Sequence, residues 1–301
     1  MKKITALFLI TLLFAQEPIT PLPKSVPIDL QKAKLGEELF SDPILSRDNT
    51  VSCASCHILN SGGDDNLPSS FGIEGQKGDL NAPTVYNALF NHVQFWDGRA
   101  KDLVEQAKGP ILNPIEMGNS AKEVVATLKK SKYNAEFKKI FRDGVTFDNI
   151  AEVIAEFEKR LITPNAPFDR YLQGEENAIS TIQKEGYALF KSKGCISCHH
   201  GVNIGGNHFN KFGVVSKIEQ NHLGRYNVTK KEQDRYYFKV PSLRNITLTA
   251  PYFHDGRTYE LKEVVKIMAK HQLGRKMSEE EIDKIIAFLH SLNGEIPKGG
   301  K

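Results

Sequence analysis

The pentapeptide Cys-x-x-Cys-His occurs twice in this chain of 301 residues, at 53–57 and at 195–199. This spacing is the attachment signature of a c-type haem. Two such thiols can bond the two vinyl groups of one porphyrin, and the adjacent histidine then lies under the iron as its ligand. A zinc knuckle or a redox dithiol would not require a histidine directly after each pair. We therefore predict two covalently bound c-type haems, held by Cys53, Cys56 and His57 and by Cys195, Cys198 and His199.

Composition and length limit the possible partners and the number of domains. The apolar fraction is 40% and the formal net charge is +4, of which Lys2 and Lys3 contribute half. A chain this close to neutrality is not expected to bind nucleic acid. Its length favours about two domains.

The first 15 residues have the pattern of a secretory signal peptide. Lys2 and Lys3 precede an apolar run from Ile4 to Phe14 that is too short to span a bilayer. Ala15 is a possible cleavage point, but Leu13 stands where the cleavage rule prefers a small side chain, so a loosely anchored, uncleaved form stays open. We expect export to the periplasm, where thiols are consumed by haem outside the reducing cytosol.

Matched segments before and after the two motifs indicate an internal duplication. The last two pairs are both 158 residues apart, and the pairs are Lys34–Phe40 with Lys184–Phe190, Pro83–Asn87 with Pro241–Asn245, and Phe95–Arg99 with Phe253–Arg257. We expect a mainly α fold of two cytochrome c-like helical domains, each around one haem, at 29–165 and 166–301. An extended, mobile, proline-rich lead-in at 16–28 precedes them.

Apolar spacing places helices within these domains. The first is expected from Asp29, and others at 121–141 and 150–161. Ser278 and Glu281 form a capping box that opens a last helix.

The two copies differ where an iron would take a second axial ligand. Met268 in the second copy corresponds to Pro110 in the first. Methionine opposite histidine makes a haem a coordinatively full electron relay. We therefore predict Met268 as the distal ligand of the second haem, with Met277 as the competing ligand and a core methionine as the plain alternative.

The first copy offers an acid in place of that methionine. Glu116 lies in a loop, and Gln106 precedes it. A carboxylate beside an open haem face can carry a proton from one peroxide oxygen to the other, and Gln106 could hydrogen-bond the same oxygens. Two alternatives remain: Glu116 is an exposed surface acid, or Met117 ligates the first iron and makes both haems relays.

With these motifs, the chain resembles the bacterial dihaem cytochrome c peroxidases over nearly its whole mature length. Besides the haem motifs, the likeness rests on residues 81–85, 94–100, 116–118, 249–256, Met268 and 272–274. The resemblance implies that the first haem is peroxidatic and the second transfers electrons. It gives Glu116 the role of catalytic acid, Gln106 that of its partner, Met268 that of axial ligand and Trp96 that of electron path between the haems.

The family also holds one calcium ion at the domain interface. The positions that match its ligands are the side chain of Asn81 and the backbone carbonyls of Thr249 and Pro251, and oxygen ligands suit this hard cation. Without the resemblance, Asn81 would only begin a turn and Trp96 would be a core aromatic. The resemblance further implies a homodimer and an electron donor that is a small c-type cytochrome or a copper protein.

One position departs from the family pattern. Many members carry a histidine in the loop 70–76 that blocks the resting peroxidatic iron, and Ile73 stands there in this chain. Isoleucine cannot ligate, so we predict a first haem that is open when fully oxidised. A low-spin first haem with two histidine ligands would contradict this and point to a substitute such as His92. His254 is placed, as a weak guess, near the docking face for the donor.

The function expected from the sequence is reduction of hydrogen peroxide to water. A non-catalytic dihaem electron carrier is one alternative. An oxidase of a protein substrate, like the related methylamine-utilisation enzymes, is another; those enzymes carry tyrosine where this chain has Met268.

Overall fold

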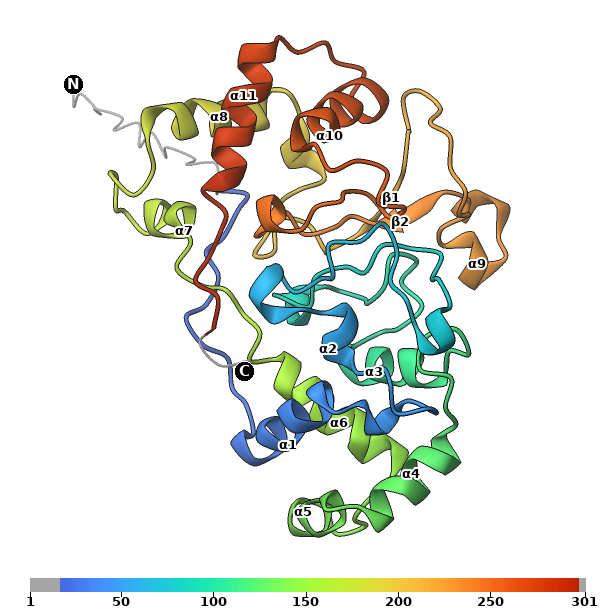
Figure 1. Ribbon diagram of the computed structural model, residues 1–301. Helices are drawn as coiled ribbons and strands as arrows, with labels where there is room; N and C mark the ends of the chain where they lie inside the picture. The colour runs from blue at the N-terminus through green and yellow to red at the C-terminus, as the bar shows by residue number, and fades with distance from the viewer. Residues whose placement is uncertain (1–16, 298–301) are drawn as a thin grey trace, which may run out of the picture.

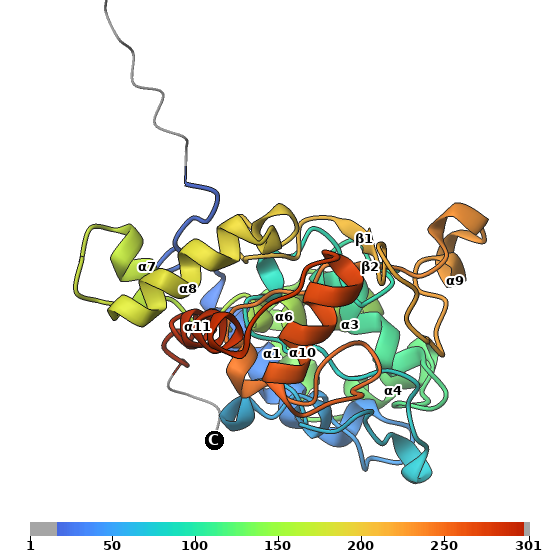
Figure 2. The ribbon, with the colours of Figure 1, turned by 90° about the horizontal axis from the view of Figure 1, so that it is seen from above.

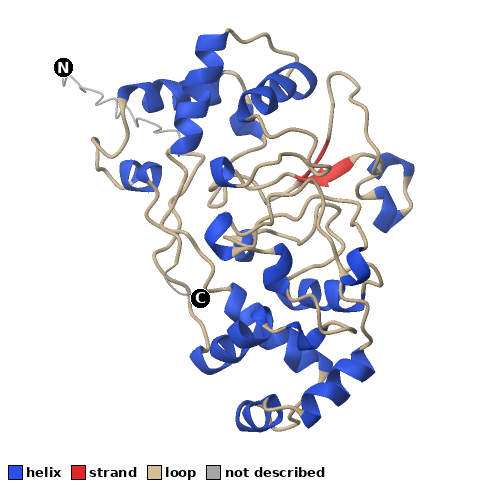
Figure 3. Ribbon diagram, viewed as in Figure 1, coloured by secondary structure: helices blue, strands red, loops and turns tan. Residues whose placement is uncertain are grey.

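The computed structural model describes residues 17–297, so the predicted signal peptide at 1–15 lies outside the described residues. Helices gather at the two ends of the molecule, and loops fill the region between them (Figures 1 and 3). One group consists of α1 (Leu30–Ser41), α3 (Leu103–Leu112), α4 (Ala121–Lys130), α5 (Tyr133–Ile140) and α6 (Phe147–Glu158). The other consists of α7 (Pro167–Leu172), α8 (Thr181–Ser192), α10 (Leu261–Ile267) and α11 (Glu279–His290). The mainly helical fold predicted from the sequence is confirmed.

Each group is built on one helix crossing, and the two crossings repeat the same contacts. In the first, Gly36 of α1 lies against α6 so closely that an added Cβ would be 1.8 Å from the Val153 carbonyl oxygen. In the second, a Cβ on Gly186 of α8 would be 1.9 Å from the Lys284 carbonyl oxygen of α11. Only glycine allows backbones to approach this closely. The repeated geometry is compatible with the predicted duplication.

Aromatic side chains fill both crossings in the same way. Phe40 packs edge-on against Phe157 at 5.2 Å between ring centroids, and Phe190 lies 5.1 Å from Phe288. Two separate apolar cores surround these pairs, one drawn from residues 35–161 and the other from residues 168–292 together with Ile19.

The second copy carries an insertion after its haem motif. It contains the two-stranded antiparallel sheet of β1 (Phe209–Lys211) and β2 (Tyr237–Lys239), in which Asn210 pairs with Phe238. The short helix α9 (Tyr226–Thr229) lies between the strands in sequence and to one side of the molecule (Figure 2). These strands border the haem cavity described below.

The lead-in, described from residue 17, is extended as expected, but it packs against the second half instead of standing free. Ile19 and Leu22 are buried, and Ile19 forms a β-bridge with Gly201. The Arg244 guanidinium also donates to the Thr20 carbonyl. These contacts restrain a segment that we expected to be mobile.

The expected helix starts are largely found. Asp29 caps α1, and Ser278 with Glu281 forms the capping box of α11. The stretch 121–141 is two helices instead of one, since α4 ends at Lys130 and the Ser131 hydroxyl bonds back to the Leu128 carbonyl. Within residues 17–297, no helix has the length and apolar character needed to cross a membrane.

Candidate haem centres

The histidines of the two motifs occupy equivalent, buried places. The His57 ring lies 6.5 Å from Phe40, and the His199 ring lies 6.5 Å from Phe190. Burial lowers the pKa of His57 and lowers that of His199 to about 4. Both imidazoles are therefore neutral at pH 7, which is the form that binds a metal.

The second nitrogen of each ring differs between the sites. The His57 Nδ1 is 3.2 Å from the Gly63 carbonyl oxygen, an arrangement that leaves Nε2 free to ligate. The His199 Nδ1 is buried with no hydrogen-bond partner among the described residues. The backbone of Ile204 and of Pro241 lies close enough to raise the pKa of His199 against the effect of burial, so backbone groups surround this ring in place of the single contact at His57.

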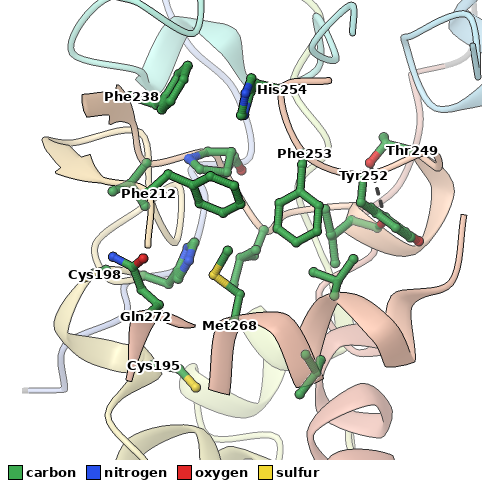
Figure 4. Close-up of a pocket in the computed structure, with 18 of the residues that line it drawn as sticks. Cys195, Cys198, Phe212, Phe238, Thr249, Tyr252, Phe253, His254, Met268 and Gln272 are labelled. Carbon is green, nitrogen blue, oxygen red and sulfur yellow. Dashed lines mark hydrogen bonds between the residues drawn. The ribbon is translucent and has the colours of Figure 1, made fainter. Parts of the chain in front are cut away.

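A deep cavity opens at the second motif (Figure 4). Cys195, Cys198 and His199 line it together with Met268, so the residues expected to hold one haem share one space. Met268 begins a π-helix, Met268–Gln272, directly after α10, and its side chain points into the space beside Phe212 and Phe253. Single π-turns of this kind are frequent at functional sites.

The donor set and the walls of this cavity fit a haem. Two thiols, a neutral imidazole and a thioether are the ligands of a His/Met c-type haem. Most of the remaining wall is apolar, with Phe190, Leu243, Val265 and Leu289 among its members. Met277 also lines the cavity, so the competing ligand is in the same space as Met268.

At the first motif, the thiols lie on the short helix α2 (Cys53–Cys56), and burial raises the pKa of Cys53 to about 12. All four cysteines are unpaired thiols, as haem attachment requires. Burial chiefly raises the pKa of Cys56, and the nearby charge of Glu116 adds to the effect. The structure thus brings Glu116 close to the first haem motif.

Glu116 is held in a fixed place and is largely withdrawn from solvent. Burial raises the pKa of its carboxyl group, against the opposing effects of the Arg99 charge and of a hydrogen bond from Asn113. The Asn113 amide donates to Oε1 of Glu116 at 2.7 Å. Gln106 is half-buried on α3. The plain alternative of an exposed surface acid does not describe Glu116.

The loop that contains Ile73 packs directly on the Glu116 loop. The Ile73 N–H donates to the Glu116 carbonyl at 2.8 Å, and its side chain is fully buried against Gly118. Met117 is also buried, in the first apolar core. His92 lies elsewhere: its Nδ1 is 2.9 Å from the Gly206 carbonyl oxygen of the second half.

Trp96 and its counterpart in the repeat, His254, meet where the two halves join. Their rings lie edge-to-face with centroids 6.2 Å apart. His254 is only 3% exposed and stacks on Phe238, so its own ring is not a surface contact, and a docking face near it stays a prediction. Its position 158 residues after Trp96 could have placed it in the interior.

Two backbone hydrogen bonds frame this pair symmetrically. The Asn81 N–H donates to the His254 carbonyl at 2.9 Å, and the N–H of Lys239, the counterpart of Asn81, donates to the Trp96 carbonyl at 2.8 Å. The Trp96 indole N–H also donates to the Asn81 carbonyl at 2.9 Å. Trp96 is therefore fixed between the halves.

The three residues implied as calcium ligands line the cavity at the second haem motif. The Asn81 side-chain amide nitrogen donates to the Leu67 carbonyl at 2.8 Å, which leaves its Oδ1 for a cation. Thr249 and Pro251 approach from the second half. Asp64 lines the cavity as well; it is 1% exposed, and one of its carboxylate oxygens has no partner among the described residues. An unpartnered buried oxygen fits a nearby cation.

Two further buried charges were not singled out from the sequence. Glu158 near Cys53 is 5% exposed, and burial raises its pKa to about 8. Lys239 lines the second cavity at 6% exposure, and burial lowers its pKa to about 8. The sequence repeat pairs Lys239 with Asn81, whereas the pairing of Glu158 with Leu289 follows only from the equivalent helix crossings in the structure.

Comparisons with known proteins agree with this geometry. The family model described as di-haem cytochrome c peroxidase matches residues 30–177, and that described as cytochrome c matches residues 183–293. The chain is 48% identical to the cytochrome c551 peroxidase of Nitrosomonas europaea, over 94% of this chain and 86% of that protein. The chain therefore belongs to the di-haem cytochrome c peroxidase family.

More particular likenesses follow. The cytochrome c peroxidase Ccp of Escherichia coli is 48% identical over 92% of this chain, which spans 61% of the length of that relative. A methylamine utilization protein MauG of Methylorubrum extorquens is more distant, at 35% identity over 94% of this chain and 84% of that protein. Among solved structures, a MauG-like protein associated with microbial copper homeostasis superposes with a TM-score of 0.81 at 27% identity, over 92% of this chain and 93% of that one.

Proposed function

We propose that this chain reduces hydrogen peroxide to water with electrons from a small redox protein. The observation that carries the proposal is that the two haem motifs have different side chains beside them. Met268 lines the cavity of the second motif, whereas Glu116, largely withdrawn from solvent, lies near the first. The family relationship supports the same activity.

The haems would be held by Cys53, Cys56 and His57 and by Cys195, Cys198, His199 and Met268. When bound, they supply the redox chemistry, with an open iron position at the first site and a filled one at the second. The chain itself orients the His57 imidazole, lines the second cavity with apolar side chains and holds the Glu116 carboxyl group in place through Asn113.

Glu116 acts as general acid and base. Its raised pKa makes the ionised carboxylate a stronger proton acceptor than an exposed glutamate. It accepts a proton from one oxygen of peroxide and returns it to the other, which leaves as water. Gln106 donates a hydrogen bond to the same oxygens. Two electrons and two further protons complete the conversion of one peroxide into two waters.

Trp96 is proposed as the path for electrons between the two sites. Hydrogen bonds from its indole and to its carbonyl at the junction of the halves support this role. A calcium ion held by Asn81, Thr249 and Pro251 would keep the same junction rigid. We also propose a periplasmic location, a homodimer, and a small c-type cytochrome or copper protein as donor.

The first site is proposed to need no reductive opening. Ile73 fills the position from which other members block the iron, and its side chain is packed into the first core. The absorption and spin-resonance spectra of the fully oxidised protein should therefore show a first haem without a second histidine ligand. A low-spin signal from two histidine ligands at this haem would overturn the assignment.

Steady-state consumption of peroxide with a reduced cytochrome donor tests the activity. We expect turnover by the oxidised protein without prior reduction. A protein that contains both haems and exchanges electrons with the donor, but leaves peroxide untouched, would be an electron carrier instead.

A further inference from the structure

The second cavity contains a cationic side chain for which the chain provides no partner. Lys239 ends β2, and only 6% of its surface is exposed. Within residues 17–297, its ammonium group takes part in no hydrogen bond and no ion pair. Taking an ammonium group out of water without a partner is costly, and a lysine this buried is rare unless paired.

The position of Lys239 is fixed by its backbone. Its N–H donates to the Trp96 carbonyl, and Lys239 pairs with Phe209 across the sheet. The side chain then lines the same cavity as Cys198, His199 and Met268.

Acidic side chains do not explain this lysine. Asp64 is the acidic residue in the cavity wall, and it forms no ion pair with Lys239. The Lys239 Nζ is not among the fully enclosed unpartnered atoms of the described residues, so it keeps accessible surface in the cavity, and a negative charge that enters with the contents of the cavity would supply its partner. A haem bonded to Cys195 and Cys198 brings two propionate carboxylates.

We propose that the Lys239 ammonium group pairs with a propionate of the haem attached to Cys195 and Cys198. The pair would restrict the orientation of this haem within the cavity that Trp96 also lines. It also places a positive charge beside the haem, which favours the reduced state. The inference rests on haem attachment at this motif and on no step of the proposed peroxide chemistry.

The repeat gives the assignment a second basis. Lys239 is the counterpart of Asn81, and their backbones make matching hydrogen bonds across the junction of the halves. The resemblance gives Asn81 a cation to hold, whereas Lys239 carries the positive charge itself. The same position thus supplies a positive charge next to the junction in each copy.

The test measures the reduction potential of the second haem in the intact protein with both haems. In Lys239→Met we expect the ratio of reduced to oxidised haem at a fixed potential to fall about tenfold, which corresponds to ~59 mV for one electron. Lys239→Arg should keep the potential near its original value because it keeps the charge. Lys211→Met is the matched control, since Lys211 lines the same cavity but is exposed.

The reduction potentials of the Lys239 variants test this inference separately from the proposed function. An unchanged potential in Lys239→Met with two haems per chain would overturn the pairing and leave the peroxidase proposal intact. Equal shifts in the methionine and arginine variants would also overturn it, since a packing role would not distinguish charge. If Lys239→Met fails to retain haem, Lys239→Gln against Lys239→Arg gives the same decision.

Discussion

The two halves of the molecule share a frame, meaning the helix crossing and the contacts around each motif histidine, and they differ in the side chains that lie around this frame. The glycine contact at the helix crossing, the phenylalanine beside the histidine and the backbone bonds around Trp96 and His254 all occur twice. These repeated features carry stability. They do not explain why one chain should need two haem sites.

The positions that differ are the ones that could divide the work. Glu158 in the first half aligns with Leu289 in the second, and Pro110 aligns with Met268. The first site thus buries a carboxyl group, whereas the second has the Met268 thioether in its cavity wall and buries Lys239. Negative charge favours the oxidised form of a haem and positive charge favours the reduced form. Lys239 therefore favours the reduced form of a haem at the second site, whereas Glu158, whose pKa burial raises to about 8, favours the oxidised form at the first site only when it is ionised.

Glu116→Gln should have the largest effect. Glutamine keeps the shape and the hydrogen bond to Asn113 but cannot transfer a proton, so peroxide turnover should fall by about 10²–10⁴-fold, or ~3–5 kcal/mol. Steady-state turnover at saturating donor measures this. Glu136→Gln on the surface of α5 is the control and should retain full activity. Near-normal turnover in Glu116→Gln would remove the chemical distinction between the two sites.

Gly36→Ala and Gly186→Ala test the shared frame. In each variant the new Cβ would clash with a backbone carbonyl of the facing helix, and the two helices would have to move apart. The free energy of unfolding should therefore fall by ~3 kcal/mol in both variants. Denaturant unfolding of the holoprotein provides the measurement. Gly75→Ala and Gly174→Ala separate this effect from backbone strain, because both positions have positive φ but open space around them. Strongly unequal losses at Gly36 and Gly186 would argue against equivalent crossings.

The frame was largely predictable from the sequence because it depends on local patterns. Haem spacing, apolar periodicity and the capping box at Ser278 each act over a few residues, and each was found. The matched segments also predicted two similar halves, although they did not reveal that Gly36 and Gly186 mark the helix crossings.

The charges around the sites were harder to predict because burial is set by distant parts of the chain. From the sequence alone, Glu158 would be predicted to be an exposed acidic residue at the end of a helix, yet it is buried beside the first core. Nothing in the sequence around His254 showed that Phe238 from the insertion and Trp96 from the other half would enclose it. Ile19 joined the second core for the same reason.

Met268→Ala sharpens the comparison at the second site. Axial ligands set haem potentials over a range of about 0.8 V. Loss of the thioether should lower the potential of the second haem by ~0.1 V, equivalent to ~2.3 kcal/mol. Redox titration followed by absorbance measures this, and Met277→Leu is the control for the other methionine in the cavity. A drop in Met277→Leu but not in Met268→Ala would reverse the ligand assignment.

Glu158→Gln should have the smallest effect, and it depends on pH. The unfolded glutamate ionises near its ordinary pKa of 4.5, whereas burial raises the pKa in the folded chain to about 8. The folded chain thus holds the proton more tightly, so this group's contribution to stability is complete below pH 4.5 and is lost as the pH rises toward 8. Between pH 6 and pH 7 the wild-type protein should lose ~1.4 kcal/mol of unfolding free energy relative to Glu158→Gln.

Denaturant unfolding of both ferric holoproteins at the two pH values checks this difference. Glu158→Leu places the residue of the second copy in the first and should show the same flat pH profile as Glu158→Gln. If the positive charge of the first haem keeps Glu158 ionised, the profiles of wild type and variants will run parallel between pH 6 and pH 7. The carboxyl group would then be a fixed negative charge beside the first haem, and both variants should raise the reduction potential of that haem, because they remove a charge that favours its oxidised form.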